Sequence, residues 1–542
     1  MTVPADPKLN ASLLLEKARR FQAAQQYPES EDCYRQAMWL DPANPDVYYG
    51  LAWLAQRAGK GGEGVRYIEL ALTINPHVYS YHFLHATVLS MIGNQDGACA
   101  AYRRAVKLNP TSVGSMNNLI FSADLHQATT PEYALALRRE FDALFCQPFM
   151  AARHELIGPF KNRPDPDRRL RVGYVSADFR AHSAAAAFGP IVLGHDHERF
   201  EIYLYSTHEA EGDDQQHAQS MFRDVGNWRN IAGISPGHQA QEVADDRIDI
   251  LVDLSGYSGG SVLQMFGMKP APVQCTGWGY TTGTGLAAMD YLFADAVTVP
   301  PELERYYSET VIRMPVVFPY AHNIAPGIRK PAPFERNGYM TYGYLGRGGK
   351  ITSLTLDTWS QVLRADPTSR MLLKSGSYRQ REVYRAALNG LLARGVDDDR
   401  VIVHMDTSRE EHLLMHNEVD VILDTMPQTG GISTCDALLM GVPVVTKLGP
   451  RLPERVSATI LTTIGYDDLV AGTVDEYVSI ALGLRPTVAY REAIRAALGA
   501  SALCDHPAYV QAAEDAYRAI WKIWCCRTVG DTLPGDTMGG GS

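Results

Sequence analysis

The sequence lacks the features that direct a protein to a membrane or to nucleic acid. Nowhere in its 542 residues do 18 apolar residues follow one another without a charge, so no membrane-spanning helix is predicted. The first residues, MTVPADPKLN, contain no basic region followed by an apolar core, and a cytoplasmic location is therefore expected by default. Lys and Arg total 50 against 61 Asp and Glu, so the net charge of -11 offers no attraction to nucleic acid or an anionic membrane.

Cysteine is sparse and metal-ligand spacings are missing. The eight cysteines include no C-x-x-C pair and are too few for a disulfide framework, so they are interpreted as reduced core thiols. No cluster of His, Cys, Asp and Glu has the spacing of a structural zinc site. The sequence therefore predicts a protein without a cofactor and a functional site that does not depend on a metal.

A repeat of 34 residues occupies the first part of the chain. Three series keep this interval: Ala18, Ala52 and Ala86; Ala37, Ala71 and Ala105; Pro42, Pro76 and Pro110. Gly59 and Gly93 keep it too, at the place where one helix must turn into the next, with Gln25 in the first repeat. Alanine lets helix backbones approach closely and proline ends each second helix, so the predicted unit is helix, turn, helix. The repeat resembles the tetratricopeptide family over residues 10–125.

Such arrays stack into a curved superhelix whose surface holds extended peptides or partner proteins. An array that only stabilises the rest of the chain is the alternative, and the repeat pattern alone does not separate the two interpretations.

From Arg169 onward, short β-rich runs alternate with helical stretches, which indicates parallel sheets with crossover helices. The predicted strands of a first lobe are 170–178, 200–206, 248–256, 273–279 and 291–295. After a linker rich in Pro and Arg near 325–336, those of a second lobe are 339–346, 370–376, 400–405, 420–425 and 442–449. The predicted fold is thus multidomain, an all-α superhelix followed by two α/β Rossmann-like lobes.

In such sheets ligands bind beyond the carboxyl ends of the strands. The strand at 420–425 leads into a Gly-rich turn with Gly430 and Gly431, and then into a helix that begins with Ile432 and Ser433. Free amides at a helix N-terminus suit a diphosphate, and Asp436 is a candidate acceptor for ribose hydroxyls. An ordinary capped turn is the competing interpretation.

The strand at 339–346 leads into RGGK, which places Lys350 before a helix. A lysine there can neutralise phosphate charge as a leaving group departs. A P-loop would need Gly at 344 and Ser or Thr at 351, but the sequence has Tyr344 and Ile351.

In the first lobe, His182 follows a strand and precedes a run of small residues, where an imidazole could accept a hydroxyl proton. A structural histidine in a loop is the alternative. GWGYTTGTG at 277–285 misses the dinucleotide fingerprint by one residue, so a dehydrogenase is a weak contender.

Together these segments resemble the O-GlcNAc transferase family, in which tetratricopeptide repeats precede a two-lobed GT-B catalytic region. GYVSADFRAH, ILVDLSGY, KPAPVQ, YSET, REEH and DALLMGVPVVT occur in the family's order. The resemblance implies inverting transfer of N-acetylglucosamine from UDP-GlcNAc to Ser or Thr hydroxyls of proteins, without a metal. It also implies a domain order of repeats at 10–125, a helical connection at 126–165, an N-terminal catalytic lobe at 166–325 and a C-terminal nucleotide-sugar lobe at 335–527. The polar, Gly-rich end of the sequence predicts a disordered tail at 528–542.

The resemblance assigns roles to individual residues. It implies that His182 is a base or positions the acceptor, that Lys350 contacts the donor diphosphate, and that Asp246 handles protons. For the nucleotide it implies that His412 packs on the base and that Arg409 and Asp436 contact the ribose. The remaining residues expected at the donor are Arg347, Thr407, Gly430, Gly431, Ile432 and Ser433.

Some positions depart from the family's pattern. The family's His-Thr-Thr at the diphosphate loop is Gly431, Ile432 and Ser433 here, and Arg347 and Met415 replace a glutamine and an arginine. Arg347 adds charge that could compensate. Related plant proteins of this architecture use GDP-fucose, so a protein O-fucosyltransferase is the nearest alternative, and a repeat scaffold that binds nucleotide with little transfer is another.

Overall fold

The computed structural model describes residues 7–208, 219–280, 282–322, 324–374, 381–405 and 407–529. The chain divides into two compact units. Unit 1 comprises Met1–Ala128, Asn337–His412 and Thr425–Pro427, and unit 2 comprises Thr129–Arg336, Leu413–Asp424 and Gln428–Ser542. Within the described ranges, no helix combines the length and apolar character that a membrane span requires.

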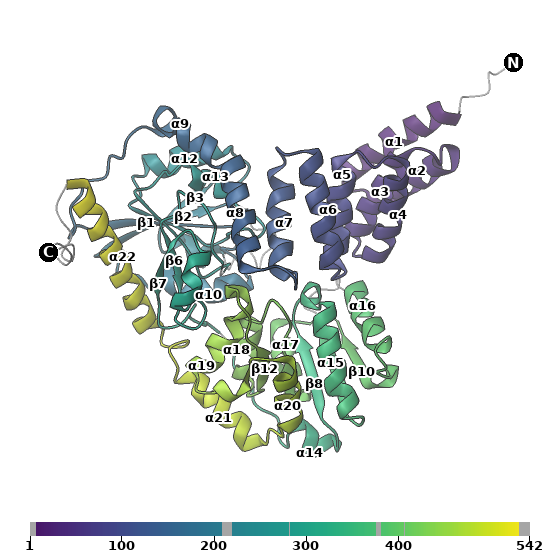
Figure 1. The fold of residues 1–542 in the computed structure, drawn as a ribbon. Helices are drawn as coiled ribbons and strands as arrows, with labels where there is room; N and C mark the ends of the chain where they lie inside the picture. The colour runs from purple at the N-terminus through teal and green to yellow at the C-terminus, as the bar shows by residue number, and fades with distance from the viewer. Residues whose placement is uncertain are drawn as a thin grey trace, which may run out of the picture. The chain divides into compact units, whose positions relative to one another are not determined.

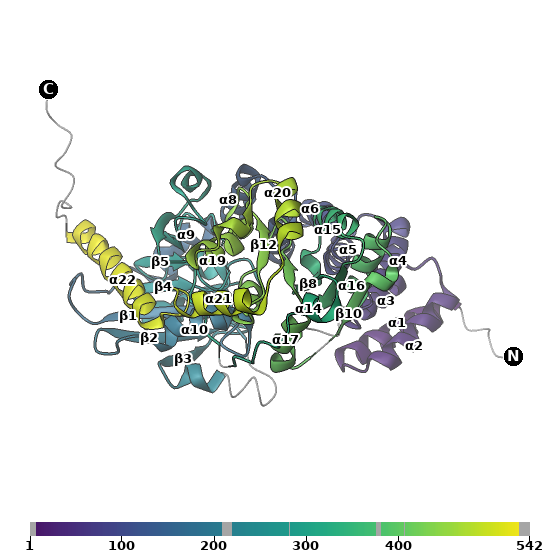
Figure 2. The same cartoon turned by 90° about the horizontal axis from the view of Figure 1, so that it is seen from below.

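The repeats form paired helices in unit 1, as the sequence predicts. Counted over the described residues, the array has seven: α1 (Pro7–Ala23), α2 (Tyr27–Leu40), α3 (Pro45–Arg57), α4 (Gly61–Ile74), α5 (Tyr79–Met91), α6 (Gln95–Leu108) and α7 (Val113–Leu125). Consecutive helices pack against each other, and α1 and α2 lie side by side in Figure 2. All six alanines of the two repeat series are completely buried, because a methyl group is all that the close helix contacts admit.

The turn inside each repeat needs a left-handed backbone. Gly59 and Gly93 adopt φ of 75° and 82°, and Gln25 takes the same conformation in the first repeat with φ of 59°. A residue with a Cβ is strained there by about 1 kcal/mol. Gly93 has a second constraint, because a Cβ would lie 3.1 Å from the carbonyl oxygen of Ile351.

Unit 1 also contains three parallel strands of the second lobe, counted within the residues that the structure describes. They are β8 (Thr341–Leu345), β9 (Arg370–Lys374) and β10 (Val401–His404), in the order β10-β9-β8. The segments around them form η2 (Gly348–Lys350), α15 (Ser353–Ala365), α16 (Arg381–Leu392), η4 (Asp398–Arg400) and the start of α17 (Arg409–Met415).

Unit 2 contains the sheet of the first lobe, whose order is β3-β2-β1-β4-β5-β6-β7 over the described residues. Every neighbouring pair is parallel. The strands are β1 (Leu170–Ser176), β2 (Phe200–Ser206), β3 (Asn227–Asn230), β4 (Ile250–Asp253), β5 (Val273–Thr276), β6 (Tyr291–Ala294) and β7 (Thr310–Arg313). The order reverses between β1 and β4, and ligands of doubly wound sheets bind beyond the carboxyl ends of strands at such a point.

Helices accompany this sheet in unit 2. They are α8 (Pro131–Phe145), α9 (Gln147–Ile157), α10 (Ser183–Leu193), α12 (Pro236–Asp245), α13 (Leu263–Gly267) and η1 (Pro301–Tyr306). The short α14 (Pro333–Asn337) instead contacts Asp420, to which the Phe334 amide donates at 2.9 Å. The long α22 (His506–Val529) returns from the end of the chain and packs against α10 and β5 (Figure 1).

A buried hydrogen-bond chain fixes α22. Glu514 accepts from Nδ1 of His195 (3.0 Å), and Nε2 of His195 accepts from the hydroxyl of Tyr174 on β1 (2.6 Å). The Tyr517 hydroxyl lies 2.9 Å from that of Tyr174, which leaves Tyr517 as the donor. Burial lowers the pKa of His195, and the ring stays neutral in the fold.

Unit 2 also contains three parallel strands of the second lobe, again counted over described residues, in the order β11-β12-β13. The strands are β11 (Val421–Leu423), β12 (Val444–Lys447) and β13 (Val470–Ala471). The helices around them are η5 (His416–Glu418), α18 (Ile432–Leu439), η6 (Leu452–Glu454), α19 (Val456–Thr463), η7 (Asp467–Leu469), α20 (Val474–Gly483) and α21 (Val488–Gly499). Arg491 of α21 is completely buried and donates to the carbonyl groups of Val419, His416 and Met440, so it holds the end of α18.

Both predicted lobes are thus present as parallel strands with crossover helices, and the predicted fold class is confirmed. Each predicted strand forms, whereas β3, β7 and β13 were not predicted. These strands are short and lie at sheet edges, where a clear apolar pattern is not needed.

The cysteines are free thiols, and five of the eight are buried. Of the predicted disordered tail, residues 530–542 lie outside the described residues.

Candidate functional site

Lys350 and Arg347 lie in the short loop that follows β8 in unit 1. Carbonyl groups hold this loop: the Tyr344 hydroxyl donates to Arg347 O (3.0 Å), and Nε2 of Gln95 on α6 donates to Gly349 O (3.0 Å). The Lys350 amide donates to Arg347 O (3.1 Å) and closes the 3-10 turn. Because Tyr344 and Gln95 are buried, the backbone is fixed, while the Arg347 side chain is exposed and Lys350 is half-buried. Two cations therefore sit on a rigid loop.

The helix after Lys350 begins with a shared cap. Thr352 is the N-cap of α15, and its hydroxyl accepts the Thr355 amide (3.2 Å) while donating to Met426 O (2.6 Å). Thr355 Oγ1 accepts the Met426 amide (3.0 Å). The start of α15 is therefore held to Met426 by the two threonine hydroxyls.

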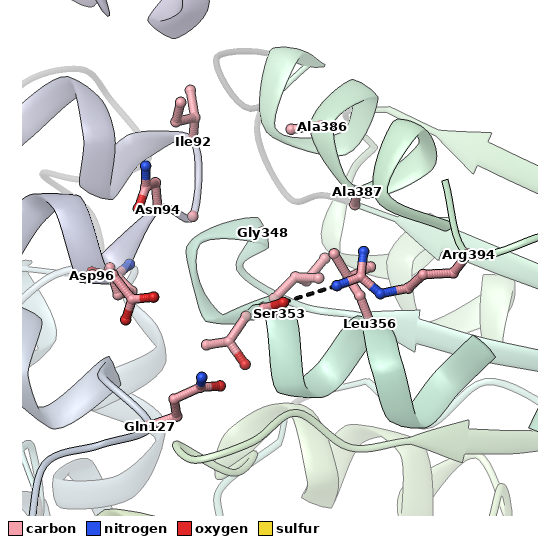
Figure 3. Close-up of a pocket in the computed structure, with 14 residues that line it drawn as sticks. Ile92, Asn94, Asp96, Gln127, Gly348, Ser353, Leu356, Ala386, Ala387 and Arg394 are labelled. Atoms are coloured by element: carbon pink, nitrogen blue, oxygen red, sulfur yellow. Dashed lines mark hydrogen bonds between the residues drawn. The ribbon is translucent and has the colours of Figure 1, made fainter. Parts of the chain in front are cut away.

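A cavity of about 260 Å³ opens beside this loop, within unit 1 (Figure 3). Its walls include Asn94, Gln127, Ser353, Leu356 and Arg394. The Arg394 guanidinium reaches the Ser353 hydroxyl at 2.8 Å, as the dashed line in Figure 3 marks. It is also paired with the Asp357 carboxylate at 2.6 Å. The Asp357 carboxylate therefore neutralises the charge of Arg394 on this wall. None of the predicted site residues of unit 1 is among the residues that line the cavity.

His412 contacts a buried lysine that sequence reasoning missed. Lys374 is the last residue of β9 and is 1% exposed, and its Nζ lies 2.8 Å from Nδ1 of His412. The Tyr384 hydroxyl of α16 donates to Lys374 O (2.7 Å) and also contacts Gly346 O, in the loop that carries Lys350. Tyr384 therefore joins the backbone after β8 to the end of β9. A lysine that ends an apolar strand, as in RMLLK, is the signal that could have revealed this contact.

The start of α17 positions the neighbours of His412. Ser408 and Glu411 form a reciprocal cap, in which Glu411 accepts the Ser408 amide (2.8 Å) and Ser408 Oγ accepts the Glu411 amide (3.2 Å). Donation from the Ser408 amide is the main reason that the pKa of Glu411 lies below its usual value. Arg409 is exposed at the first position of this helix. Thr407 has a buried Oγ1 without a hydrogen-bond partner among the described residues.

In unit 2, α18 begins with unused amide groups. The N-cap is Gly431, which has no side chain to cap the helix, and the amides of Gly431, Ile432 and Ser433 donate to no acceptor within the described residues. The Gly430 amide donates to Asp424 (2.9 Å), which orients the turn. A Cβ on Gly430 would lie 2.1 Å from Thr434 Oγ1, so glycine is required for packing there. Three free amides at a helix start can bind an anion.

Asp436 lies inside unit 2 and already has a partner. Its carboxylate is 2% exposed and accepts from the Tyr320 hydroxyl at 2.6 Å. Tyr320 is itself completely buried, and its amide donates to Leu503 O (2.7 Å). The carboxylate that was predicted to contact a ribose is therefore fixed by the segment that follows the first sheet.

His182 lies at the topological switch point of the first sheet, beyond the carboxyl end of β1. It is the N-cap of α10, and its Nδ1 is 3.2 Å from the Ala184 amide nitrogen and 3.3 Å from Oδ2 of Asp178. An amide can only donate, so the capping arrangement places the ring proton on Nε2. If the proton moves to Nδ1, it faces Asp178, and Nε2 becomes an acceptor. The α10 helix packs against α18, so unit 2 brings these two elements together.

Asp246 lies at the opposite edge of the sheet from His182, because it precedes β4 rather than following a strand. Its carboxylate accepts from the Tyr205 hydroxyl (2.8 Å) and from two nitrogens of Arg229 (2.8 and 3.1 Å). Burial, and then the charge of Asp246, raise the pKa of Tyr205 well above its usual value, so this hydroxyl remains a donor. The structure does not bring Asp246 to the carboxyl edge.

The Gly-rich segment 277–285 serves packing within unit 2. Glu309 accepts the amides of Thr284 (2.6 Å) and Gly285 (3.2 Å), so the groups that would hold a dinucleotide phosphate are already used. A Cβ on Gly279 would lie 2.0 Å from Leu254 O. These glycines admit close backbone contacts.

A comparison with protein families matches residues 146–323 and 339–512 to the model of glycosyl transferase family 41. The chain belongs to glycosyl transferase family 41. Among solved structures, a lysine-to-methionine mutant of the Thermobaculum terrenum O-GlcNAc transferase is similar over 97% of this chain and 100% of that one, with 28% identity and a TM-score of 0.84.

Curated relatives of this family 41 chain include plant proteins. One is the probable UDP-N-acetylglucosamine-peptide N-acetylglucosaminyltransferase SPINDLY of Petunia hybrida, 32% identical over 69% of this chain and 41% of that protein. Another is the probable UDP-N-acetylglucosamine-peptide N-acetylglucosaminyltransferase SEC of Arabidopsis thaliana, 27% identical over 66% of this chain and 38% of that protein. The chain spans less than half the length of these relatives.

Sequence reasoning also missed Asp178 as a partner of His182, the predicted base. Its side chain is 11% exposed, Arg180 donates to its Oδ1 (3.1 Å), and its other oxygen faces His182. The spacing of four residues between Asp178 and His182 in SADFRAH was visible, but only the turn after β1 brings the two side chains together.

Proposed function

We propose that this chain transfers N-acetylglucosamine from UDP-N-acetylglucosamine to Ser or Thr hydroxyls of proteins, with inversion and without a metal. Family membership and the names of the relatives support a glycosyltransferase that acts on peptides. The observation that carries the proposal is the start of α18, where Gly431, Ile432 and Ser433 offer free amides at the N-terminus of a buried helix. A donor diphosphate is the ligand that this arrangement suits.

In the proposed reaction, the acceptor oxygen bonds to the anomeric carbon while the bond from that carbon to the diphosphate oxygen breaks. The electron pair of the broken bond stays on the diphosphate, which needs positive charge as it departs. We assign stabilisation of the departing diphosphate to Lys350 and Arg347. Their loop is held by hydrogen bonds, so these cations need little reorganisation during the reaction. The free amides at the start of α18 are likewise suited to a diphosphate, so the proposed charge stabilisation does not require a metal.

His182 is proposed to receive the acceptor proton on Nε2. That nitrogen has a lone pair only when the ring proton is on Nδ1, where Asp178 accepts it at 3.3 Å. Asp178 would then also stabilise the imidazolium that forms, as the carboxylate of a hydrolytic triad does. Asp246 is assigned a structural role instead, since its oxygens already accept from Tyr205 and Arg229.

For the nucleotide, we assign base contact to His412 and a ribose contact to Arg409, with Thr407 two residues before Arg409. Asp436 of unit 2 keeps its predicted role as an acceptor for ribose hydroxyls. The buried, unbonded Oγ1 of Thr407 supports a ligand group at this position, because an unsatisfied buried hydroxyl is costly. The repeat array is proposed to hold the acceptor protein, in keeping with the use of stacked helical repeats for extended peptides.

The deciding experiment measures transfer of labelled sugar to protein together with nucleotide binding. We expect labelled protein product from UDP-N-acetylglucosamine, unchanged turnover in EDTA, and tighter calorimetric binding of UDP than of GDP. Tighter GDP binding with fucosyl transfer would replace the donor by GDP-fucose. Nucleotide binding without any labelled product would instead make the chain a scaffold.

A further inference from the structure

A buried lysine contacts the histidine that is proposed to face the nucleotide base. Lys374 is almost completely buried, and its Nζ lies 2.8 Å from Nδ1 of His412. An ammonium group carries three donors and no acceptor, so in this contact the lysine donates and the imidazole nitrogen accepts. The ring must then be neutral, with its proton on Nε2.

The lysine is itself held in place. It ends β9, and its carbonyl accepts from the buried Tyr384 hydroxyl at 2.7 Å. On the other side, His412 follows the reciprocal cap of Ser408 and Glu411, which fixes the first turn of α17. Both partners therefore approach each other from rigid backbone, and the contact does not depend on two flexible side chains meeting.

We propose that Lys374 is a positioning residue for the nucleoside diphosphate: it fixes the tautomer and the ring orientation of His412. A neutral ring with Nε2-H presents an uncharged face for stacking on a base and one donor at a defined atom. The inference rests on the proposed function for its ligand, but the contact itself is a property of the free protein.

The first test reads the tautomer in the protein without nucleotide. The chain is labelled with 15N-histidine, and the His412 signals are identified by their loss in His412→Gln. We expect Nδ1 to show the shift of an unprotonated nitrogen and Nε2 that of a protonated one at pH 7. A proton on Nδ1 in the wild-type chain would overturn the inference, whatever the variants do.

The second test uses Lys374→Met, with UDP and GDP as calorimetric probes. We expect binding of the preferred nucleotide to weaken about tenfold, the loss of one hydrogen bond to a charged group, and His412 to become a mixture of tautomers. Lys269→Met is the matched control, because Lys269 is another largely buried lysine, bonded to Ala288 O (2.8 Å) and Asp290 in unit 2. It should lower thermal stability and leave nucleotide affinity unchanged.

The outcomes separate the two hypotheses. Unchanged affinity and an unchanged His412 tautomer in a folded Lys374→Met chain would overturn the positioning role. Absence of binding of either nucleotide to the wild-type chain would reject the proposed function, while the histidine spectrum would still decide the Lys374 contact.

Discussion

Substituting Gly430 by alanine tests whether the start of α18 is the anion site. The new Cβ would lie 2.1 Å from Oγ1 of Thr434, whereas ordinary contact begins at 3.4 Å, so one group must move by about 1.3 Å. Thr434 is buried, and its Oγ1 is hydrogen bonded to Ser457 Oγ at 2.8 Å, so its side chain cannot rotate away without losing that bond. The first turn of α18 is expected to shift instead.

The expected cost has two parts. Overpacking costs about 1–3 kcal/mol, and loss of the Thr434–Ser457 hydrogen bond adds about 1 kcal/mol. A displaced helix start should also lose at least one amide bond to the diphosphate, which corresponds to about tenfold or more in UDP affinity. Thermal unfolding and calorimetric titration with UDP measure the two effects.

Gly431→Ala is the matched control. Its Cβ would meet Phe318 and Val456 at 3.6 Å, an ordinary contact distance, and the amide is retained. We expect a smaller loss of stability than in Gly430→Ala, because no neighbouring group is forced to move. A Gly430→Ala chain that melts at the wild-type temperature and binds UDP with wild-type affinity would refute the assignment of α18 as the anion site.

Four further predictions follow from the site and the fold. Lys350→Ala should lower kcat by about 100- to 1,000-fold through loss of leaving-group stabilisation, and full activity would remove the role of this lysine. Asp178→Asn should lower kcat about 100-fold with little change in the donor KM, because His182 then lacks its partner for the base-competent tautomer, and equal kcat would contradict that role. Tyr384→Phe should destabilise the chain by about 1–2 kcal/mol in thermal unfolding and raise the donor KM in steady-state kinetics, because the hydroxyl contacts Gly346 O and Lys374 O. An unchanged KM would show that this hydroxyl does not position the loops after β8 and β9 for the donor. Burial lowers the pKa of His195, so as pH falls below about 6.5 the histidine takes up a proton in the unfolded chain before it does in the folded one. The free energy of unfolding should therefore decline there by up to about 1.4 kcal/mol per pH unit. His195→Gln should reduce this slope in urea unfolding at several pH values, and an unreduced slope would show that His195 does not cause it.

Much of the fold was predictable because its helices and strands follow from short-range sequence periodicity. The 34-residue interval identified the helix pairs, since only small residues fit where helices touch, and the alanines at 18, 52 and 86 are indeed buried. Apolar runs between helical stretches identified the strands of both lobes. The short edge strand β3 (NWRN) escaped prediction because its half-exposed residues carry no apolar pattern.

The candidate site was predictable only in part. Positions after strands and Gly-rich turns pointed to His182, Lys350 and the start of α18, because the chemistry of those segments is local. Lys374 and Asp178 gave only weak signals, a lysine at the end of an apolar strand and a spacing of four residues, because the partner of each is decided by the packing of another element or turn.

By itself, the sequence determined the repeat, the two groups of parallel strands and the segments where ligands should be sought, because propensity, periodicity and turn chemistry act over a few residues. The tertiary structure alone decided which polar atoms are already used. It showed the amides of Thr284 and Gly285 bonded to Glu309, Asp246 bonded to Arg229, and Lys374 directed at His412. Hydrogen bonds between distant residues depend on how strands and helices pack, and no local pattern records that packing.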